Sequence, residues 1–250
     1  KKIKKFIDHI LLLFSFEKKY FEKEKISCEF VGHPLLEIKS YDKIDINQVV
    51  GKNKAIISVF PGSRISEINT LMPILLNFIK LMSRKYNDIT YVFHSNIEHN
   101  DLINSFIKNS ELPNCEVISD SKIKSHLLRK SIFAVAKSGT VSLEICNAKI
   151  PSVIVYKMNF INFLIIKMIV KINFANIINI AANEEIIPEL LQSKCNSKNI
   201  YKVVSNFLDT PSKIEEQVKK TQIVINRFRT NKPSAELASH ALNNILLRQI

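Results

Sequence analysis

Short apolar segments alternate with segments of helical period along most of this 250-residue chain, and this alternation is the strongest constraint on its fold. Residues 55–60 form an apolar run that ends at a Pro-Gly turn, which is typical of a buried parallel strand. From Ile65 to Met82 the apolar residues recur on one helical face, and Pro73 predicts a kink or a restart there. Repeated strand–helix units with few hairpin signals predict an α/β fold with a doubly wound parallel sheet.

The same periodicity predicts the other elements and the domain boundaries. Further strands are expected over 9–14, 28–31, 90–93, 116–118, 132–136 and 152–156. Further helices are expected over 17–25, 101–109, 125–130, 140–149, 160–171, 184–192, 197–208, 211–229 and 234–249. Residues 34–50 show no strong periodicity of apolar residues and are predicted to be a linker, so the main domain is expected to cover 51–231. Residues 1–33 are expected to end a preceding domain, and 232–250 to form a separate last helix.

The composition excludes several classes of protein. A hydrophobic content of 46% with four glycines and eight prolines excludes collagen-like and disordered chains. The four cysteines have no C-x-x-C spacing, which argues against a disulfide framework or structural zinc, and no cluster with metal-ligand spacing is apparent. The net charge of +13 comes mainly from scattered lysines, with six arginines and no tryptophan, so nucleic acid is not expected as a partner. Anionic lipid or a phosphorylated substrate suits this charge better.

No segment is predicted to span a membrane. Residues 160–172 form the most apolar stretch, but it is too short for a span and contains Lys167 and Lys171. Both a buried helix and an amphipathic helix at a membrane surface fit this stretch.

Three of the four glycines follow predicted strands, at the sheet edge where open α/β folds bind ligands. Gly32 ends one strand, and Gly62, Ser63 and Arg64 join another strand to a helix. Backbone N–H groups and the helix dipole favour a phosphate at such a junction. Ser63 can cap the helix, and Arg64 can pair with a diphosphate.

Ser138, Gly139 and Thr140 form a similar loop with two hydroxyl groups, and Lys137 adds a cation beside it. Glu144 follows one helical turn later, where a carboxylate suits the two hydroxyls of a ribose. Each feature alone is also typical of ordinary turns and caps. Together at one sheet edge, the two loops predict a nucleoside diphosphate site. The sequence contains no G-x-x-x-x-G-K-[ST] motif, which argues against phosphoryl transfer from ATP.

Six blocks of the sequence carry a family resemblance. They are 8–17 (DHILLLFSFE), 30–37 (FVGHPLLE), 60–68 (FPGSRISEI), 138–148 (SGTVSLEICNA), 151–158 (PSVIVYKM) and 178–192 (INIAANEEIIPELLQ). On these blocks the chain resembles the lipid-A-disaccharide synthases, glycosyltransferases of the GT-B class. The resemblance implies Rossmann-like domains, with the nucleotide in the C-terminal one and the last helix crossing back to the first.

The resemblance also implies a reaction and its site. It implies transfer of 2,3-diacylglucosamine from its UDP derivative to 2,3-diacylglucosamine 1-phosphate, giving the β-1,6 lipid A disaccharide 1-phosphate and UDP, without metal or cofactor. The residues that would bind the UDP-sugar are Gly62, Ser63, Arg64, Ser138, Gly139, Thr140, Glu144 and Asn179. A helix N-cap is the structural alternative for Asn179.

The chain departs from the family pattern at two places. Ile178 stands where family members often have proline, and Asn183-Glu184 stand where Gly-Arg often occurs. The missing arginine would remove a cation from the diphosphate region, and Lys137 and Lys157 are the candidates to replace it.

The family's N-terminal domain supplies the acceptor site and the expected base, and residues 1–33 are interpreted as a remnant of it. We therefore assign no catalytic residue. Expected partners are the UDP-2,3-diacylglucosamine donor, a lipid-linked acceptor, and either a second copy or a missing N-terminal half. The expected location is peripheral, at the cytoplasmic face of the bacterial inner membrane. A UDP-binding but catalytically incomplete fragment and another GT-B enzyme acting on UDP-sugars are the alternatives.

Overall fold

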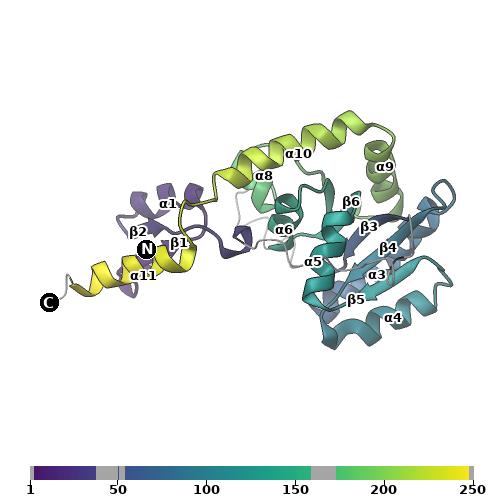
Figure 1. The fold of residues 1–250 in the computed structure, drawn as a ribbon, viewed down its shortest axis with the longest axis horizontal. Coiled ribbons are helices and arrows are strands. Elements are labelled where there is room, and N and C mark those ends of the chain that lie inside the picture. Colours follow the sequence, from purple (N-terminus) through teal and green to yellow (C-terminus); the bar gives the residue numbers. More distant parts are fainter. Residues whose placement is uncertain (1–2, 38–49, 51–53, 159–172, 248–250) are drawn as a thin grey trace. The chain divides into compact units, whose positions relative to one another are not determined.

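The computed structural model describes residues 3–37, 50, 54–158 and 173–247 (Figure 1). These residues form two compact units, a larger one within 40–222 and a smaller one within 1–39 and 223–250. The division falls inside the helix α10 (Pro211–Asn226), after residue 222 and not at the predicted boundary at 231. The smaller unit combines the two ends of the chain.

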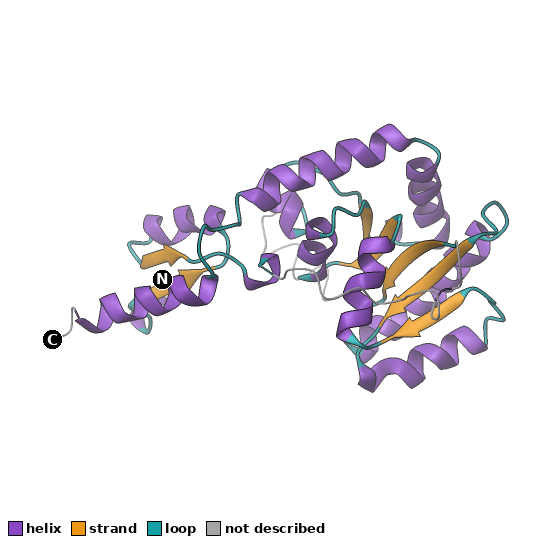
Figure 2. Ribbon diagram, in the orientation of Figure 1, coloured by secondary structure: helices purple, strands orange, loops and turns teal. Residues whose placement is uncertain are grey.

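The larger unit is built on a six-stranded sheet in which every neighbouring pair of strands is parallel (Figure 2). The strand order is β5-β4-β3-β6-β7-β8. The strands are β3 (Ala55–Phe60), β4 (Ile89–His94), β5 (Cys115–Ile118), β6 (Phe133–Lys137), β7 (Ser152–Tyr156) and β8 (Glu189–Leu191). The predicted α/β fold with a doubly wound parallel sheet is confirmed.

Helices cover both faces of this sheet (Figure 1). They are α3 (Ile65–Met82), α4 (Asn100–Lys108), α5 (Ser121–Lys130), α6 (Val141–Asn147), α8 (Ile177–Ala182), α9 (Ser197–Leu208) and α10. Side chains alternate across the strands, so Ile57 packs in the core formed with α3, α4 and α9. Ile56 points the other way and packs with Leu127 of α5.

The helix α3 is continuous across Pro73, so the predicted restart does not occur. Eight of its side chains are buried, and this burial outweighs the lost backbone hydrogen bond of the proline. Among the described helices, α3 has the length and apolar composition to cross a membrane, but half of it is buried in the core. Its apolar character is therefore explained by packing against the sheet and α9.

The predicted helix over 184–192 is wrong, because this region contains the strand β8. The helix α8 ends at Ala182, and Asn183 takes the left-handed conformation with φ 54°. Pro188 follows, and its carbonyl accepts a hydrogen bond from the Ile154 N–H as β8 pairs with β7. The buried Glu189 carboxylate accepts backbone N–H groups from residues 175 and 176, which explains how a charged residue lies in a strand. The helix predicted over 160–171 lies outside the described residues.

The smaller unit contains a parallel pair of strands, β1 (His9–Leu12) and β2 (Ser27–Phe30), joined through α1 (Lys18–Lys23). The helix α11 (Ser234–Leu247) belongs to the same unit. Phe14 and Phe16 pack against Phe228, with ring centroids 5.0 and 6.0 Å from it. The Ser234 N–H donates to the Glu37 carboxylate at 2.7 Å, so contacts within this unit join the C-terminal segment to the N-terminal one.

Candidate functional site

A cleft of about 270 Å³ opens at the carboxyl ends of β3, β4 and β6. The strand order reverses between β3 and β6, and such a switch point is where open α/β sheets bind ligands. Six of the predicted site residues line this cleft, namely Gly62, Ser63, Ser138, Gly139, Thr140 and Glu144. The remaining lining residues are Phe60, His94, Asn96, Lys124, Lys137 and Val141. The structure thus brings the two predicted loops together at one cleft.

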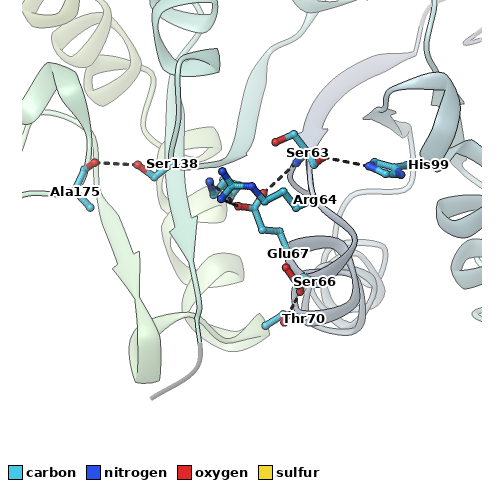
Figure 3. A network of polar contacts seen from close by, with 9 residues as sticks. Ser63, Arg64, Ser66, Glu67, Thr70, His99, Ser138 and Ala175 are labelled. Carbon is cyan, nitrogen blue, oxygen red and sulfur yellow. Dashed lines mark hydrogen bonds and ion pairs between the residues drawn. The ribbon is translucent and has the colours of Figure 1, made fainter. Parts of the chain in front are cut away.

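Glu67 organises the first of these loops (Figure 3). Its carboxylate accepts the Ser63 N–H at 3.1 Å and lies 2.9 Å from the Lys137 ammonium and 3.7 Å from the Arg64 guanidinium. Burial raises the pKa of Glu67, but these hydrogen bonds and charges outweigh it, so the pKa lies below its usual value. Gly62 has φ +124°, and a β-carbon there would lie 2.7 Å from the Glu67 side chain. The loop therefore requires glycine next to a charged carboxylate.

Two expectations for this loop need correction. Ser63 does not cap α3, because the N-cap position is Arg64 and no side chain caps it. The Ser63 N–H is also not free for a phosphate, since the Glu67 carboxylate already accepts it. The Arg64 side chain is 79% exposed beside the cleft, which leaves its guanidinium accessible to an anion. The group that this loop leaves accessible to an anion is thus the Arg64 side chain and not the Ser63 amide.

The second loop leads from β6 into α6. The Ser138 hydroxyl donates to the Ala175 carbonyl at 2.9 Å, which fixes this side of the loop (Figure 3). A β-carbon on Gly139 would meet nothing within 4 Å, so the space over this residue is open. Thr140 occupies the N-cap position of α6 without a capping hydrogen bond from its hydroxyl. Its hydroxyl is therefore not committed to capping at the cleft.

Glu144 lies opposite a cation that the sequence did not single out. Burial raises the pKa of Glu144, and the charge of Lys124 opposes this rise. The Lys124 ammonium donates to the Ser95 carbonyl at 3.0 Å, and burial lowers its pKa. Lys124 lies within the polar helix α5, where a lysine ordinarily faces solvent. The residues around it therefore do not indicate that it lines the cleft.

An aromatic pair forms the β4 side of the cleft. The rings of Phe60 and His94 stack with centroids 4.2 Å apart. His94 is buried, and its Nε2 lies 2.8 Å from the Ser58 hydroxyl. Burial, together with the charge of Lys124, lowers the pKa of His94 to about 3. This neutral histidine was also missed, because its place in the cleft depends on the pairing of β3 with β4.

The structure does not bring Asn179 into the cleft. Its side chain is fully buried, and its oxygen accepts the N–H groups of Ile186 and Ile187. Its amide donates to the Ile187 carbonyl at 2.7 Å and to Glu189 at 2.8 Å. The N-cap of α8 is Asn176, so Asn179 is not a helix cap either. Its observed contacts hold the turn between α8 and β8.

Metal-binding clusters are not found in the part of the chain that the structure describes. No group of three or more histidine, cysteine or acidic side chains comes together there. Cys146 and Cys195 are buried free thiols, and burial raises the pKa of both. The chemistry available in the cleft is therefore that of cations, carboxylates, hydroxyls and a neutral imidazole.

Sequence comparisons match nearly the whole chain. A family model described as lipid-A-disaccharide synthetase matches residues 1–242. The lipid-A-disaccharide synthases of Rickettsia prowazekii and Rhodospirillum centenum are 32% and 27% identical to the chain, over 97% and 100% of its length. These matches cover 65% and 63% of the two relatives, so the chain spans slightly less than two thirds of their length.

Solved structures with a similar fold include a complex with UDP, a complex with UDP-GlcNAc and a domain of a glycosyl transferase. The S. aureus MnaA–UDP co-structure has a TM-score of 0.64 at 13% identity, covering 96% of this chain and 60% of that one. The UDP-GlcNAc 2-epimerase of Neisseria meningitidis, bound to UDP-GlcNAc, has a TM-score of 0.60 at 12% identity, covering 93% and 60%. The C-terminal domain of a group 1 glycosyl transferase from Francisella tularensis has a TM-score of 0.51 at 13% identity, covering 79% and 98%. At these identities the likeness establishes the Rossmann-like fold of GT-B proteins.

Proposed function

Because the chain belongs to the lipid-A-disaccharide synthase family, we propose that its larger unit binds the UDP moiety of a diacylated sugar donor. The donor is UDP-2,3-diacylglucosamine and the acceptor is 2,3-diacylglucosamine 1-phosphate. The products are the β-1,6-linked lipid A disaccharide 1-phosphate and UDP. One observation carries the proposal: both glycine-containing loops and Glu144 line a single cleft at the switch point of the sheet.

The parts of the cleft suit the parts of UDP. Arg64 and Lys137 lie beside the two loops and supply positive charge for the diphosphate. The hydroxyl of Thr140 adds a donor to the same region. Glu144 lines the same cleft and is assigned the two ribose hydroxyls in this proposal. Asn179 is left out of this assignment, since its side chain is buried among protein hydrogen bonds.

The proposed reaction is a displacement at the anomeric carbon of the donor. The 6-hydroxyl oxygen of the acceptor forms the new bond as the bond from the anomeric carbon to the diphosphate breaks. UDP leaves with the electron pair, and the hydroxyl proton passes to a base that we do not assign. Negative charge grows on the diphosphate during this step, and fixed cations beside it stabilise the transition state more than the ground state. Arg64 and Lys137 have this role in the proposal.

The partners and location of the protein are part of the same proposal. Both substrates carry acyl chains and phosphate groups, so the protein is proposed to act peripherally at the cytoplasmic face of the bacterial inner membrane. Its net charge of +13 suits an anionic surface. The stretch 160–172, proposed as a contact with the membrane, lies outside the described residues. The acceptor site and the base stay unassigned, and a second copy or an N-terminal half is the proposed protein partner.

The test of the nucleotide site is a calorimetric titration with UDP. Arg64→Ala is expected to weaken UDP binding about 10-fold or more, because a charge-assisted contact contributes about 1.5–3 kcal/mol. Arg84→Ala is the matched control, since Arg84 is an exposed arginine that does not line the cleft. Equal UDP affinity in the wild type and Arg64→Ala would end the assignment of Arg64.

Two alternatives are separated by the substrates used. Several structural neighbours carry UDP-GlcNAc in their names, which makes a soluble UDP-sugar the competing donor. Turnover of UDP-GlcNAc but not of a detergent-solubilised diacylated donor would favour that alternative. UDP binding without turnover, with activity restored by an added N-terminal half, would identify a catalytically incomplete fragment.

A further inference from the structure

A chain of hydroxyl groups beneath the cleft fixes the tautomer of His94. The Ser131 hydroxyl donates to the Leu127 carbonyl at 2.9 Å, so its single proton is committed. Ser131 therefore accepts the bond that joins it to Ser58, at 2.7 Å, and the Ser58 proton is committed in turn. The 2.8 Å bond between Ser58 and His94 must then be donated by Nε2–H of the histidine. His94 thus carries its proton on Nε2.

The other ring nitrogen, Nδ1, is consequently a hydrogen-bond acceptor. The pKa of about 3 keeps the ring neutral at physiological pH, so Nδ1 stays unprotonated. The two nitrogens of an imidazole point in widely different directions, which turns Nδ1 away from the buried Ser58. Among the described residues no hydrogen bond to Nδ1 of His94 is found, and Nδ1 is not one of the fully buried polar atoms that lack a partner, so it is open to the cleft. Because His94 lines the cleft, its Nδ1 is the acceptor that a ligand meets there.

The surroundings hold the imidazole in this orientation. Phe60 stacks on the ring, with an angle of 16° between the ring planes. In the sheet, Val59 pairs with Phe93, so Phe60 and His94 follow at matching positions on neighbouring strands. Lys124 also lines this part of the cleft, but its ammonium donates to the Ser95 carbonyl. The imidazole is therefore held by a stacking contact and a hydrogen bond before any ligand arrives.

The place of His94 also matches one part of a nucleotide. The two glycine-containing loops follow β3 and β6, and His94 ends β4 on the other side of β3. With the diphosphate at the loops and the ribose at Glu144, the remaining lining residues are Phe60, His94, Asn96, Lys124 and Val141. This part of the cleft is the one left for the base.

We propose that Nδ1 of His94 accepts a hydrogen bond from the N3–H of the donor's uracil, and that this contact selects uracil over cytosine. The proposal rests on the proposed function. Uracil carries a proton on N3, whereas cytosine has a lone pair there, so cytosine in the same pose would place one acceptor against another. A site that loses a hydrogen bond and opposes two lone pairs disfavours the wrong ligand more than a site that only loses a contact.

The test compares UDP and CDP in calorimetric titrations of the full chain. The wild type is expected to bind UDP at least 10-fold more tightly than CDP. His94→Phe keeps an aromatic ring against Phe60 but removes the acceptor, and is expected to lower UDP affinity about 3- to 10-fold while leaving CDP affinity unchanged or higher. His240→Phe is the matched control, because His240 is an exposed histidine outside the larger unit.

A second measurement on the unaltered protein does not depend on the folding of a variant. With histidine labelled by ¹⁵N, the Nδ1 resonance of His94 should be that of an unprotonated nitrogen in the free protein. Adding UDP should shift this resonance toward the hydrogen-bonded position, and adding CDP should not.

Ser58→Ala, which removes the partner of Nε2, should reduce the preference for UDP while His94 is still present.

The possible outcomes separate the two proposals. Failure of the wild type to bind UDP overturns the proposed function, and the assignment of His94 with it. Binding of UDP with equal affinity for CDP, or with an unshifted Nδ1 resonance, overturns the role of His94 alone. A protonated Nδ1 in the free protein would also overturn it, because the hydroxyl chain would then run the other way.

Discussion

Asn179→Ala tests whether the asparagine of the INIAANEE block supports the fold or contacts the ligand. The side chain makes four hydrogen bonds of 2.7–3.0 Å, two of which satisfy the backbone N–H groups of Ile186 and Ile187. The substitution leaves the N–H and the carbonyl of Ile187 without that partner, whereas the Ile186 N–H keeps its hydrogen bond to the Glu184 carbonyl. An unsatisfied buried group costs about 1–3 kcal/mol, so we expect a loss of about 2–4 kcal/mol in the free energy of unfolding.

The assay is urea unfolding of the wild type and the variant. The midpoint and the slope of the unfolding free energy against urea concentration are compared between them. Asn206→Ala is the control, because the Asn206 side chain is exposed and accepts a hydrogen bond from the exposed side chain of Lys213. Its change in the free energy of unfolding should stay within about 0.5 kcal/mol. UDP affinity of Asn179→Ala, measured where the variant is folded, should change little. Unchanged stability with a large loss of UDP affinity would refute the reasoning and assign Asn179 to the ligand.

Three further changes test the cleft. Gly62→Ala should lower the free energy of unfolding by about 1–3 kcal/mol in chemical denaturation, because φ is +124° and the new methyl would meet Glu67 at 2.7 Å; wild-type stability would contradict the need of this turn for glycine. Lys137→Met should weaken UDP binding several-fold but leave uridine binding unchanged in parallel titrations, with Lys85→Met, from the exposed pair with Asp209, as the control. Between pH 6.5 and about 3 the His94 ring is protonated in the unfolded chain but not in the folded chain. The free energy of unfolding should therefore fall as pH falls through this window, and His94 should contribute no pH dependence above about pH 7. His94→Phe should reduce this dependence of the unfolding free energy on pH, measured by urea titrations at several pH values.

The strands and the loop positions could be predicted from the sequence because their signals are local. Residues 55–60 and 152–156 are continuous apolar runs with clear ends, and both were predicted with the bounds that the structure shows. The glycines after β3 and β6 then placed two loops at the same edge, since parallel strands end together. These predictions needed only the local sequence of each strand and its following loop, together with the rule that parallel strands end at the same edge of a sheet.

The strand β8 could not be predicted in this way. Its residues Glu189, Leu190 and Leu191 all have intrinsic propensities that favour a helix. The strand forms because β7 offers a free edge and because backbone N–H groups before α8 bind the Glu189 carboxylate. Both causes lie far away in the sequence, so tertiary contacts override the local preference.

The missed cleft residues share a similar cause. The sequence indicates Glu67 only as part of a helix, yet its carboxylate joins Lys137 of β6 to the loop after β3. His94 ends a buried strand, and nothing near it in the sequence indicates Ser58 or Phe60 as a neighbour. Such pairs depend on the order and register of the strands. The sequence predicts the class of fold but not that order and register.

The charges at the cleft are nearly balanced, which bears on how the protein uses its basic composition. Glu67 pairs with Lys137 and Arg64, while Lys124 and Glu144 oppose one another in the same cleft. A single excess cation cannot neutralise a diphosphate, so selection there must come from directed hydrogen bonds and shape more than from net charge. The net charge of +13 consequently resides mostly outside the cleft, on lysines that suit a broad anionic surface such as a membrane. Salt should therefore weaken association with anionic vesicles more than it weakens UDP binding, because many exposed lysines would contact the vesicle, whereas the UDP site combines the exposed Arg64 with the largely buried Lys137.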